Sequence, residues 1–442
     1  MRSDLRQLTP GAPRGERLAI EFEGQAVPAF GGESVAAALF AAGITVLGRS
    51  AKYHRPRGVF CMEGHCASCY LRIDGRPNRR ACMTPARDGL RCERQNAFPS
   101  ADVDLLQAAD WLFPEGMDHH TLMTGTRVGN QLFLKLVRQM GGSGTLPDPR
   151  SPGDGGGDGD GAPADQTCDL CVVGGGPAGL GAARAAAQRL PGARVVLFDE
   201  QAVLGGSLLA EPGGTARAAA LADAARRAGA TLVSGATAIA FFPEDRGADG
   251  QPGLLAVVTP DGLRRVSARR YLYATGGYDQ NIPFPDNDRP GVVSARACGR
   301  LAFHHGIRPV RPGRRVLVLG TAPAGASLAG GLRAAGVEVE AVDQTHFETH
   351  FEAGLAVRRR GDLVAVAALP APASELPRQH GAAVETAPAR GGFALTVDDA
   401  FCSTAAGVHG CGDVTGFVGP RAAAEAGAAA GAAVAERLRG QP

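Results

Sequence analysis

The stretch that decides the fold is DLCVVGGGPAG, residues 169–179. It is typical of a short apolar strand that runs into glycines spaced G-x-G-x-x-G and then into an alanine-rich helix ending near Leu190. The first glycine makes a tight turn, the second admits a pyrophosphate, and the third lets helix and strand pack closely. The helix N-terminus supplies N–H groups for the phosphates. The stretch therefore predicts a dinucleotide-binding βαβ unit.

Further stretches extend this nucleotide site. A second strand, residues 194–198, ends in two adjacent acids about 20 residues beyond the glycines, where an acid that holds a ribose is expected; the spacing does not choose between them. Another glycine pair, a Thr-Gly turn after a strand that begins at Tyr271, and a Gly-Asp pair before a C-terminal alanine-rich helix follow in order. The candidate cofactor-binding residues are Gly174, Gly176, Pro177, Ala178, Gly179, Asp199, Glu200, Gly205, Gly206, Ala274, Thr275, Gly276, Gly412 and Asp413.

In this order the motifs resemble the two-dinucleotide-binding flavoproteins, which include glutathione-reductase-like and thioredoxin-reductase-like enzymes. The resemblance implies a bound FAD and assigns its ribityl chain to Asp413. It also implies an NAD(P)-binding insert, whose βαβ unit begins here at Arg315 with Ala322 in place of the middle glycine and Asp343 as its ribose acid. Because the insert spans only residues 313–362, we expect a vestigial fold rather than a working NAD(P) site. Residues 363–367 are expected to return to the FAD domain.

Four cysteines ahead of this region have the spacing of an iron–sulfur site. Cys61, Cys66, Cys69 and Cys82 are spaced C-x4-C-x2-C-x12-C, which begins like the plant-type 2Fe-2S ferredoxins. Four thiolates hold two irons, and a tight loop lets backbone N–H groups approach the cluster sulfurs. Zinc, the alternative, prefers paired C-x2-C knuckles, and only one such pair is present here. The pattern favours a 2Fe-2S cluster, with Cys92 as a spare core thiol.

The residues around these cysteines predict a small β-grasp fold. Residues 18–23 and 26–30 can form a hairpin, and a helix over residues 35–42 is punctuated by Ser34 and Gly43. A Gly/Pro/Ser/Asp-rich linker is expected to tether the two halves of the chain without fixing their geometry. The predicted architecture is α/β, with a ferredoxin-like 2Fe-2S domain over residues 1–140, the linker over 141–166, an FAD-binding domain over 167–312 and 363–442, and the insert over 313–362.

Composition excludes several classes of partner. The 442 residues carry 46 Lys and Arg against 44 Asp and Glu, a net charge of +2, which gives no electrostatic case for nucleic acid or an anionic membrane. No run of about 18 apolar residues predicts a transmembrane helix. The N-terminus shows no secretory signal, so we expect a cytoplasmic protein with reduced thiols. Cys168 and Cys171 are expected on opposite faces of their strand, and His119 and His120 on the surface.

Taken together, the two halves resemble one family over nearly the whole chain. Residues 48–58, 95–100 and 112–117 resemble the ferredoxin-like region in the alpha subunit of heterotetrameric sarcosine oxidase. The four cysteines resemble the related subunits of hydrogen cyanide synthase, of opine and octopine oxidases, and of dye-linked proline or hydroxyproline dehydrogenases. The resemblance implies an electron-transfer subunit of a hetero-oligomer. A flavoprotein beta subunit would oxidise a C–N bond of an amine or amino acid, and this chain would receive the electrons through FAD and the cluster.

Several readings stay open at this point. The family can place an FMN between subunits, and the basic run over residues 52–57 is compatible with its phosphate, with a partner or with packing. The chain could instead be a fused subunit that oxidises glycine to cyanide, a self-sufficient NAD(P)H-dependent reductase, or a non-catalytic FAD-binding scaffold. No catalytic side chain stands out, and the substrate is expected to bind in another chain.

Overall fold

The N-terminal part folds into a ferredoxin-like domain around one mixed sheet. The computed structural model describes residues 4–6, 14–51, 53–112, 126–140, 164–247, 250, 252–284, 286–320, 322–342 and 363–440. The sheet has the order β2-β1-β7-β5-β6, with β7 parallel to β1 and the other neighbours antiparallel. The helix begins after Ser34, whose hydroxyl accepts the N–H of Ala37 at 3.2 Å. The elements are β1 (Arg17–Phe22), β2 (Gln25–Phe30), α1 (Val35–Ala41), β3 (Gly48–Arg49), β4 (Pro56–Arg57), β5 (Tyr70–Ile73), β6 (Arg76–Arg80) and β7 (Arg91–Glu93).

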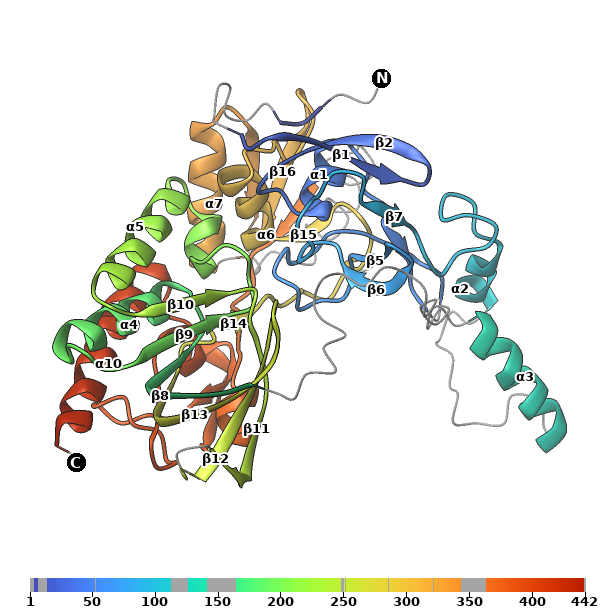
Figure 1. Cartoon of the computed structure of the whole chain (residues 1–442). Helices are drawn as coiled ribbons and strands as arrows, with labels where there is room; N and C mark the ends of the chain where they lie inside the picture. The colour runs from blue at the N-terminus through green and yellow to red at the C-terminus, as the bar shows by residue number, and fades with distance from the viewer. Residues whose placement is uncertain are drawn as a thin grey trace.

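The FAD-type domain is built on a larger sheet with the order β10-β9-β8-β13-β12-β11, and β22 pairs with the last residues of β13. Helices α4, α5 and α10 lie together on one side of it (Figure 1), and their alanines share a core with β8 and β9. The first strand begins at Ala164, inside the expected linker, because residues 164–168 extend along β13. The elements are β8 (Ala164–Val173), α4 (Pro177–Arg189), β9 (Val195–Asp199), α5 (Gly214–Arg227), β10 (Thr231–Ser234), β11 (Thr237–Arg246), β12 (Pro252–Thr259), β13 (Gly262–Tyr273), β22 (Val408–Gly410) and α10 (Pro420–Arg439).

A second, smaller parallel sheet has the order β15-β18-β16-β17 and draws strands from both sides of the expected insert. Residues 363–366, expected to return to the FAD domain, form β18, which pairs with β15 and β16 of this second sheet and not with the larger one. A short apolar run fits any parallel sheet that is buried on both faces, so its pattern does not identify the sheet. Asp343 lies outside the described residues. The elements are β15 (Val292–Ser294), α6 (Ala295–Gly299), β16 (Arg315–Leu319), α7 (Pro323–Ala334), β17 (Glu338–Val342) and β18 (Leu363–Val366).

The ferredoxin-like domain and the second sheet share one hydrophobic core. A single cluster of buried side chains includes Leu39 and Leu71 on one side and Leu301 and Leu332 on the other. The basic run also contributes to this interface, because Arg57 lies 2.8 Å from Asp288. Packing therefore sets the orientation that the linker was expected to leave free. Residues 141–163 of that linker lie outside the described residues.

After β7 the chain forms an extension that carries exposed apolar side chains. The start of the extension is held by His54, whose Nδ1 lies 3.0 Å from the Asp104 carboxylate, with both residues buried. In Figure 1 the last helix of the extension points away from the rest of the molecule. The side chains of Trp111 and Leu132 are 78% and 73% exposed, whereas His119 and His120 lie outside the described residues. The elements are η1 (Leu105–Gln107), α2 (Ala108–Leu112) and α3 (Arg127–Met140).

An irregularity in β8 brings two cysteines to the same core. The N–H groups of Asp169 and Leu170 both point to the Arg194 carbonyl, at 2.9 and 3.3 Å, which interrupts the regular alternation of the strand. Cys168 and Cys171 consequently lie in one hydrophobic cluster with their thiols in contact. The expectation that they lie on opposite faces is wrong.

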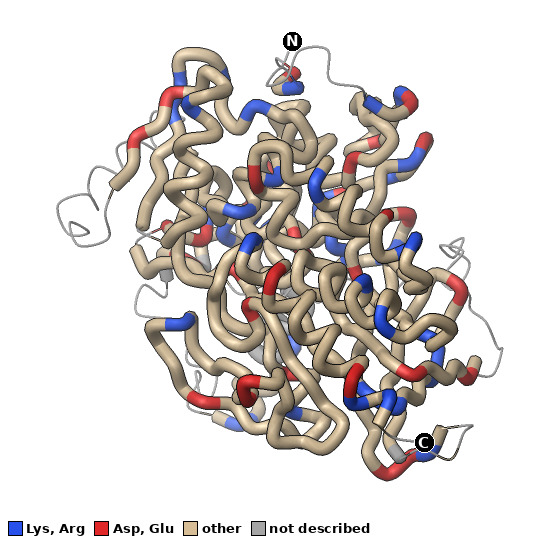
Figure 2. The backbone as a smooth tube through the Cα atoms, turned by 90° about the vertical axis from the view of Figure 1, so that its left-hand side faces the viewer, with Lys and Arg blue, Asp and Glu red and all other residues tan. Residues whose placement is uncertain are grey.

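Charged residues of both signs are interspersed along the backbone (Figure 2), in keeping with a net charge of +2. None of the helices in the described part of the chain combines the length and the apolar character that a membrane span requires.

Candidate functional site

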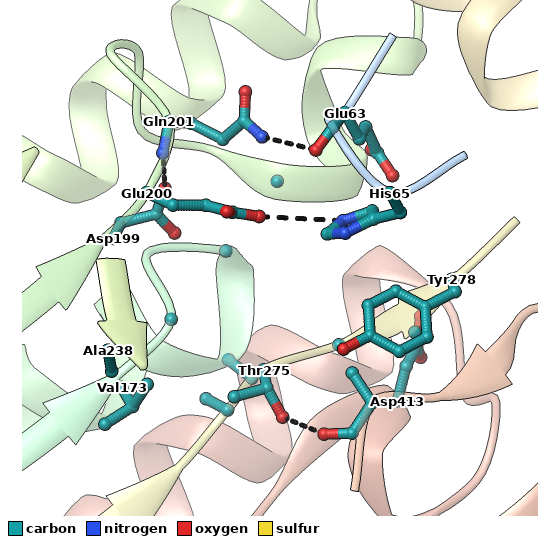
Figure 3. Close-up of a pocket in the computed structure, with 18 of the residues that line it drawn as sticks. Glu63, His65, Val173, Asp199, Glu200, Gln201, Ala238, Thr275, Tyr278 and Asp413 are labelled. Carbon is teal, nitrogen blue, oxygen red and sulfur yellow. Dashed lines mark hydrogen bonds and ion pairs between the residues drawn. The ribbon is translucent and has the colours of Figure 1, made fainter. Parts of the chain in front are cut away.

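One large cavity collects nearly all the predicted cofactor-binding residues. It has a volume of about 360 Å³ and lies where strands β8, β9 and β13 end. All of the predicted residues line it except Gly179, Gly205 and Gly412. Glu63 and His65, which belong to the ferredoxin-like domain, line it as well (Figure 3). The cavity is therefore built by both domains.

The glycine loop is shaped by close backbone contacts. Gly174 has a φ of 108°, and a Cβ at this position would clash with the Ala274 carbonyl. A Cβ on Gly206 would lie 2.8 Å from the Cα of Gly176, so the pair Gly205–Gly206 packs directly against the glycine loop. Helix α4 begins directly after Gly176, which has no side chain to cap the first N–H groups. These N–H groups suit a phosphate.

The two candidate ribose acids have different surroundings. Asp199 is built into the loop, because its carboxylate accepts the N–H groups of Gly175 at 2.5 Å and Gln201 at 2.7 Å. Burial raises the pKa of Asp199 to about 6, although these two N–H groups act in the opposite direction. The Glu200 carboxylate instead lies 3.8 Å from His65 Nε2 of the other domain. Asp199 therefore lies beside the glycine loop and Glu200 faces the ferredoxin-like domain, a distinction that the motif spacing could not make.

The Gly-Asp turn also reaches the cavity. One carboxylate oxygen of Asp413 accepts the N–H groups of Val418 at 3.0 Å and Gly419 at 3.2 Å, just before α10 begins. A Cβ on Gly412 would lie 2.7 Å from the Cβ of Ala178, so the turn packs against the start of α4. These two hydrogen bonds fix the Asp413 carboxylate, and the residue lines the cavity (Figure 3).

The cluster loop, defined here as residues 61–69, forms one wall of the cavity. Gln201 donates its Nε2–H to the Glu63 carbonyl at 3.0 Å and approaches the sulfur of Met83 at 3.3 Å. The ring of His65 lies 4.6 Å from that of Tyr278, measured between centroids. Residues beside three of the predicted cluster ligands therefore contact the FAD-type domain.

Two buried arginines that sequence reasoning missed complete this wall. Arg300, at the start of a π-helical turn after α6, donates to Glu63 Oε1 at 2.6 Å and to the Gly206 carbonyl at 2.9 Å. Its Nε is buried without a hydrogen-bond partner, which costs stability unless an acceptor arrives. Arg296 lies 2.5 Å from the Asp279 carboxylate. The one sequence signal was two arginines four residues apart in an otherwise largely apolar stretch.

The charges of Glu63 and Arg296 stabilise each other against burial. Burial would raise the pKa of Glu63, but the charges of Arg296 and Arg300 lower it below its usual value. Burial would likewise lower the pKa of Arg296, but Asp279 and Glu63 raise it. The buried Nε of Arg300 suits a ligand that offers a hydrogen-bond acceptor.

The thiols of the four predicted cluster ligands form a continuous series of contacts. The thiol of Cys61 contacts those of Cys66 and Cys82, and Cys82 in turn contacts Cys69. Within the described part of the chain, no three or more Cys, His, Asp or Glu side chains surround a single metal position. Cys92 is buried in the core, where burial raises its pKa to about 12.

Comparison with known proteins gives both halves a family. Residues 15–97 match the 2Fe-2S iron-sulfur cluster binding domain, and residues 168–349 match the pyridine nucleotide-disulphide oxidoreductases. The chain is 32% identical over 351 residues to sarcosine oxidase subunit alpha of Rhizobium meliloti, a match that covers 74% of this chain and 34% of that relative. It is 42% identical over 79 residues to hydrogen cyanide synthase subunit HcnA of Pseudomonas aeruginosa, which covers 18% of this chain and 75% of that subunit.

A solved structure has the same overall fold. The L-proline dehydrogenase from P. horikoshii matches with a TM-score of 0.70 at 20% identity, over 99% of this chain and 76% of that one. This chain spans about a third of the length of the sarcosine oxidase alpha subunits that it matches. A 2Fe-2S ferredoxin-like domain is thus followed by an FAD-binding oxidoreductase domain, and the chain resembles the alpha subunits of sarcosine oxidase over most of its length and the HcnA subunit of hydrogen cyanide synthase in its N-terminal part.

Proposed function

We propose that this chain is the FAD- and 2Fe-2S-containing electron-transfer subunit of a heteromeric dehydrogenase or oxidase. A partner flavoprotein would oxidise a C–N bond of an amine or amino acid of the sarcosine, proline or opine type. The observation that carries the proposal is the shared wall of the cavity, where Glu63 and His65 of the cluster loop stand opposite the glycine loop. This arrangement would place two redox groups side by side within one chain.

In this proposal the cavity residues divide the work of holding FAD. The Gly174–Gly179 loop and the first N–H groups of α4 take the pyrophosphate. Asp199 takes the ribose, since it is fixed beside the loop, and Asp413 takes the ribityl chain. The bound flavin supplies two-electron exchange on one side and one-electron exchange on the other. The side chains bind it, orient it and satisfy its acceptors, for which the buried Nε of Arg300 is suited.

The order of the four thiols supports a two-iron cluster. Each iron of a 2Fe-2S cluster takes two protein thiolates, so the ligands fall into two pairs. In the run of contacts Cys61 and Cys66 form one end, and Cys69 and Cys82 form the other. Backbone N–H groups also point at the sulfurs, as that of Glu63 does at Cys61 at 3.4 Å.

Two features support a partner subunit. The relatives are themselves named as subunits of sarcosine oxidase, hydrogen cyanide synthase and opine oxidase. In the described residues, large exposed apolar side chains gather on the extension after β7, where Val103, Leu105, Trp111, Val128 and Leu132 are all more than half exposed. Exposed apolar patches of this kind mark interaction sites.

An anaerobic visible and EPR titration of the purified chain tests the proposal. We expect flavin absorbance in the isolated protein, no reduction by NADH, and the signal of a reduced 2Fe-2S cluster once dithionite is added. Sarcosine, proline or an opine should reduce the chain only after the partner flavoprotein is supplied. Reduction by NADH alone would instead favour a self-sufficient reductase, and flavin without any iron signal would favour a scaffold.

A further inference from the structure

Glu63 stands at the boundary between the two cofactor sites. It lies between the first two predicted cluster ligands, and its backbone N–H points at the sulfur of Cys61 at 3.4 Å. Its side chain leaves the cluster loop, is only 6% exposed and lines the FAD cavity. One residue therefore contacts the cluster site through its main chain and the flavin site through its carboxylate.

The carboxylate of Glu63 contacts two arginines of the FAD-type half of the chain. Its Oε1 lies 2.6 Å from Arg300 Nη2, and its Oε2 lies 3.6 Å from Arg296 Nη2. Arg300 also donates to the Gly206 carbonyl at 2.9 Å. A continuous run of contacts thus leads from Cys61, through Glu63 and Arg300, to the loop that packs on the glycine loop.

The arginines in this run are paired with carboxylates before any cofactor enters. Arg296 and Arg300 face two buried carboxylates, those of Glu63 and Asp279. Charges interact more strongly in a buried site than in water, and removing one partner leaves the other uncompensated. Loss of the Glu63 charge would make the cavity less negative, which favours the more negative, reduced form of a flavin.

We infer that Glu63 and Arg300 couple the cluster site to the flavin site, so that a change at either is felt at the other. This inference rests on the proposed FAD and 2Fe-2S sites and adds that their redox properties are interdependent. Glu63 acts as a positioning residue in this arrangement, because it orients Arg300 and shares a loop with Cys61. Neither residue needs to exchange a proton for the coupling to operate.

The test changes one side of the boundary and measures the other. Arg300→Lys alters only the FAD-type half, yet we expect it to change the EPR spectrum and midpoint potential of the cluster. Glu63→Gln removes a carboxylate that the cluster loop contributes to the FAD cavity, and we expect it to raise the midpoint potential of the flavin. Glu385→Gln is the control, because it removes a carboxylate that pairs with Arg390 in the FAD-type half, outside the Glu63–Arg300 run and away from the cluster loop. It should leave the cluster signal as in the wild type.

Each outcome decides the inference. If both variants bind iron and FAD fully and keep the spectra and midpoint potentials of the wild type, the inference is overturned and the ion pair is only a structural contact. If Glu63→Gln does not retain FAD, Arg300→Lys measured at the cluster decides alone. A cluster signal that shifts equally in Glu385→Gln would also overturn it, because the effect would then be general electrostatics. A wild-type chain without flavin or iron would refute the proposed function too, whereas a loaded wild type without cross-effects refutes only the coupling.

Discussion

Replacing Gly427 by alanine is expected to loosen the FAD-type domain, and the geometry sets the size of the effect. Helix α10 crosses α4 so closely that a methyl group on Gly427 would lie 2.6 Å from the carbonyl carbon of Ala178 and closer still to its oxygen. Carbon atoms pack best at about 3.5–4.0 Å, so the helices must move apart by about 1 Å. Such overpacking costs roughly 1–3 kcal/mol, and the better helix propensity of alanine returns about 1 kcal/mol. The free energy of unfolding should fall by up to about 2 kcal/mol.

The same substitution at Gly330 provides the control. Gly330 is exposed in α7, and a methyl group there would meet no atom within 4 Å. Gly330→Ala should therefore raise the free energy of unfolding by about 1 kcal/mol. Urea unfolding followed by circular dichroism compares the two variants, and an FAD titration should show weaker binding only for Gly427→Ala, because Ala178 lines the cavity. A Gly427→Ala protein as stable as Gly330→Ala would refute the close helix contact.

Three further predictions concern the cofactor residues. Cys66→Ser should abolish the EPR signal of the reduced cluster, whereas Cys92→Ser, in the core, should keep it; equal loss in both would contradict the ligand assignment. Asp199→Asn should weaken FAD binding about tenfold, as expected when a hydrogen bond to a charged group is lost. Glu200→Gln should weaken FAD binding less. A fluorescence titration in which Glu200→Gln has the larger effect would contradict the assignment of the ribose to Asp199. Burial raises the pKa of Asp199 from 3.8 to about 6, so the native apoprotein binds this proton more tightly than the unfolded chain does. The stability that this group contributes should therefore be lost as the pH rises from about 4 to about 6. Urea unfolding at several pH values should show that the free energy of unfolding of the wild type falls relative to that of Asp199→Asn over this range, and a difference independent of pH would contradict the prediction.

The parts of the site that follow from local rules could be predicted from the sequence. The glycine at position 174 is needed because its φ is 108°, and any side chain there would meet Ala274. The hairpin turn at Asp74-Gly75, where both residues have positive φ, joins β5 and β6 as its sequence indicates. In each case the positive φ is a requirement on the residue itself, so the local sequence pattern indicates it.

The contacts that join distant segments could not be predicted in this way. Glu63 and Arg300 are 237 residues apart in the chain, and nothing near either one specifies the other. The choice between Asp199 and Glu200 depended on which carboxylate turns back to the glycine loop. The contact between Cys168 and Cys171 arises from an irregular strand, which simple alternation of faces does not anticipate.

The core that the ferredoxin-like domain shares with the second sheet has a kinetic consequence. Carrier domains on loose tethers deliver electrons by swinging between a donor and an acceptor. In the proposed electron-transfer subunit this movement would be blocked, so a soluble acceptor would have to collide with a cluster domain that is fixed in place. The rate of electron delivery should then depend on acceptor concentration and, for a charged acceptor, on ionic strength. Lengthening or shortening the linker should leave it unchanged.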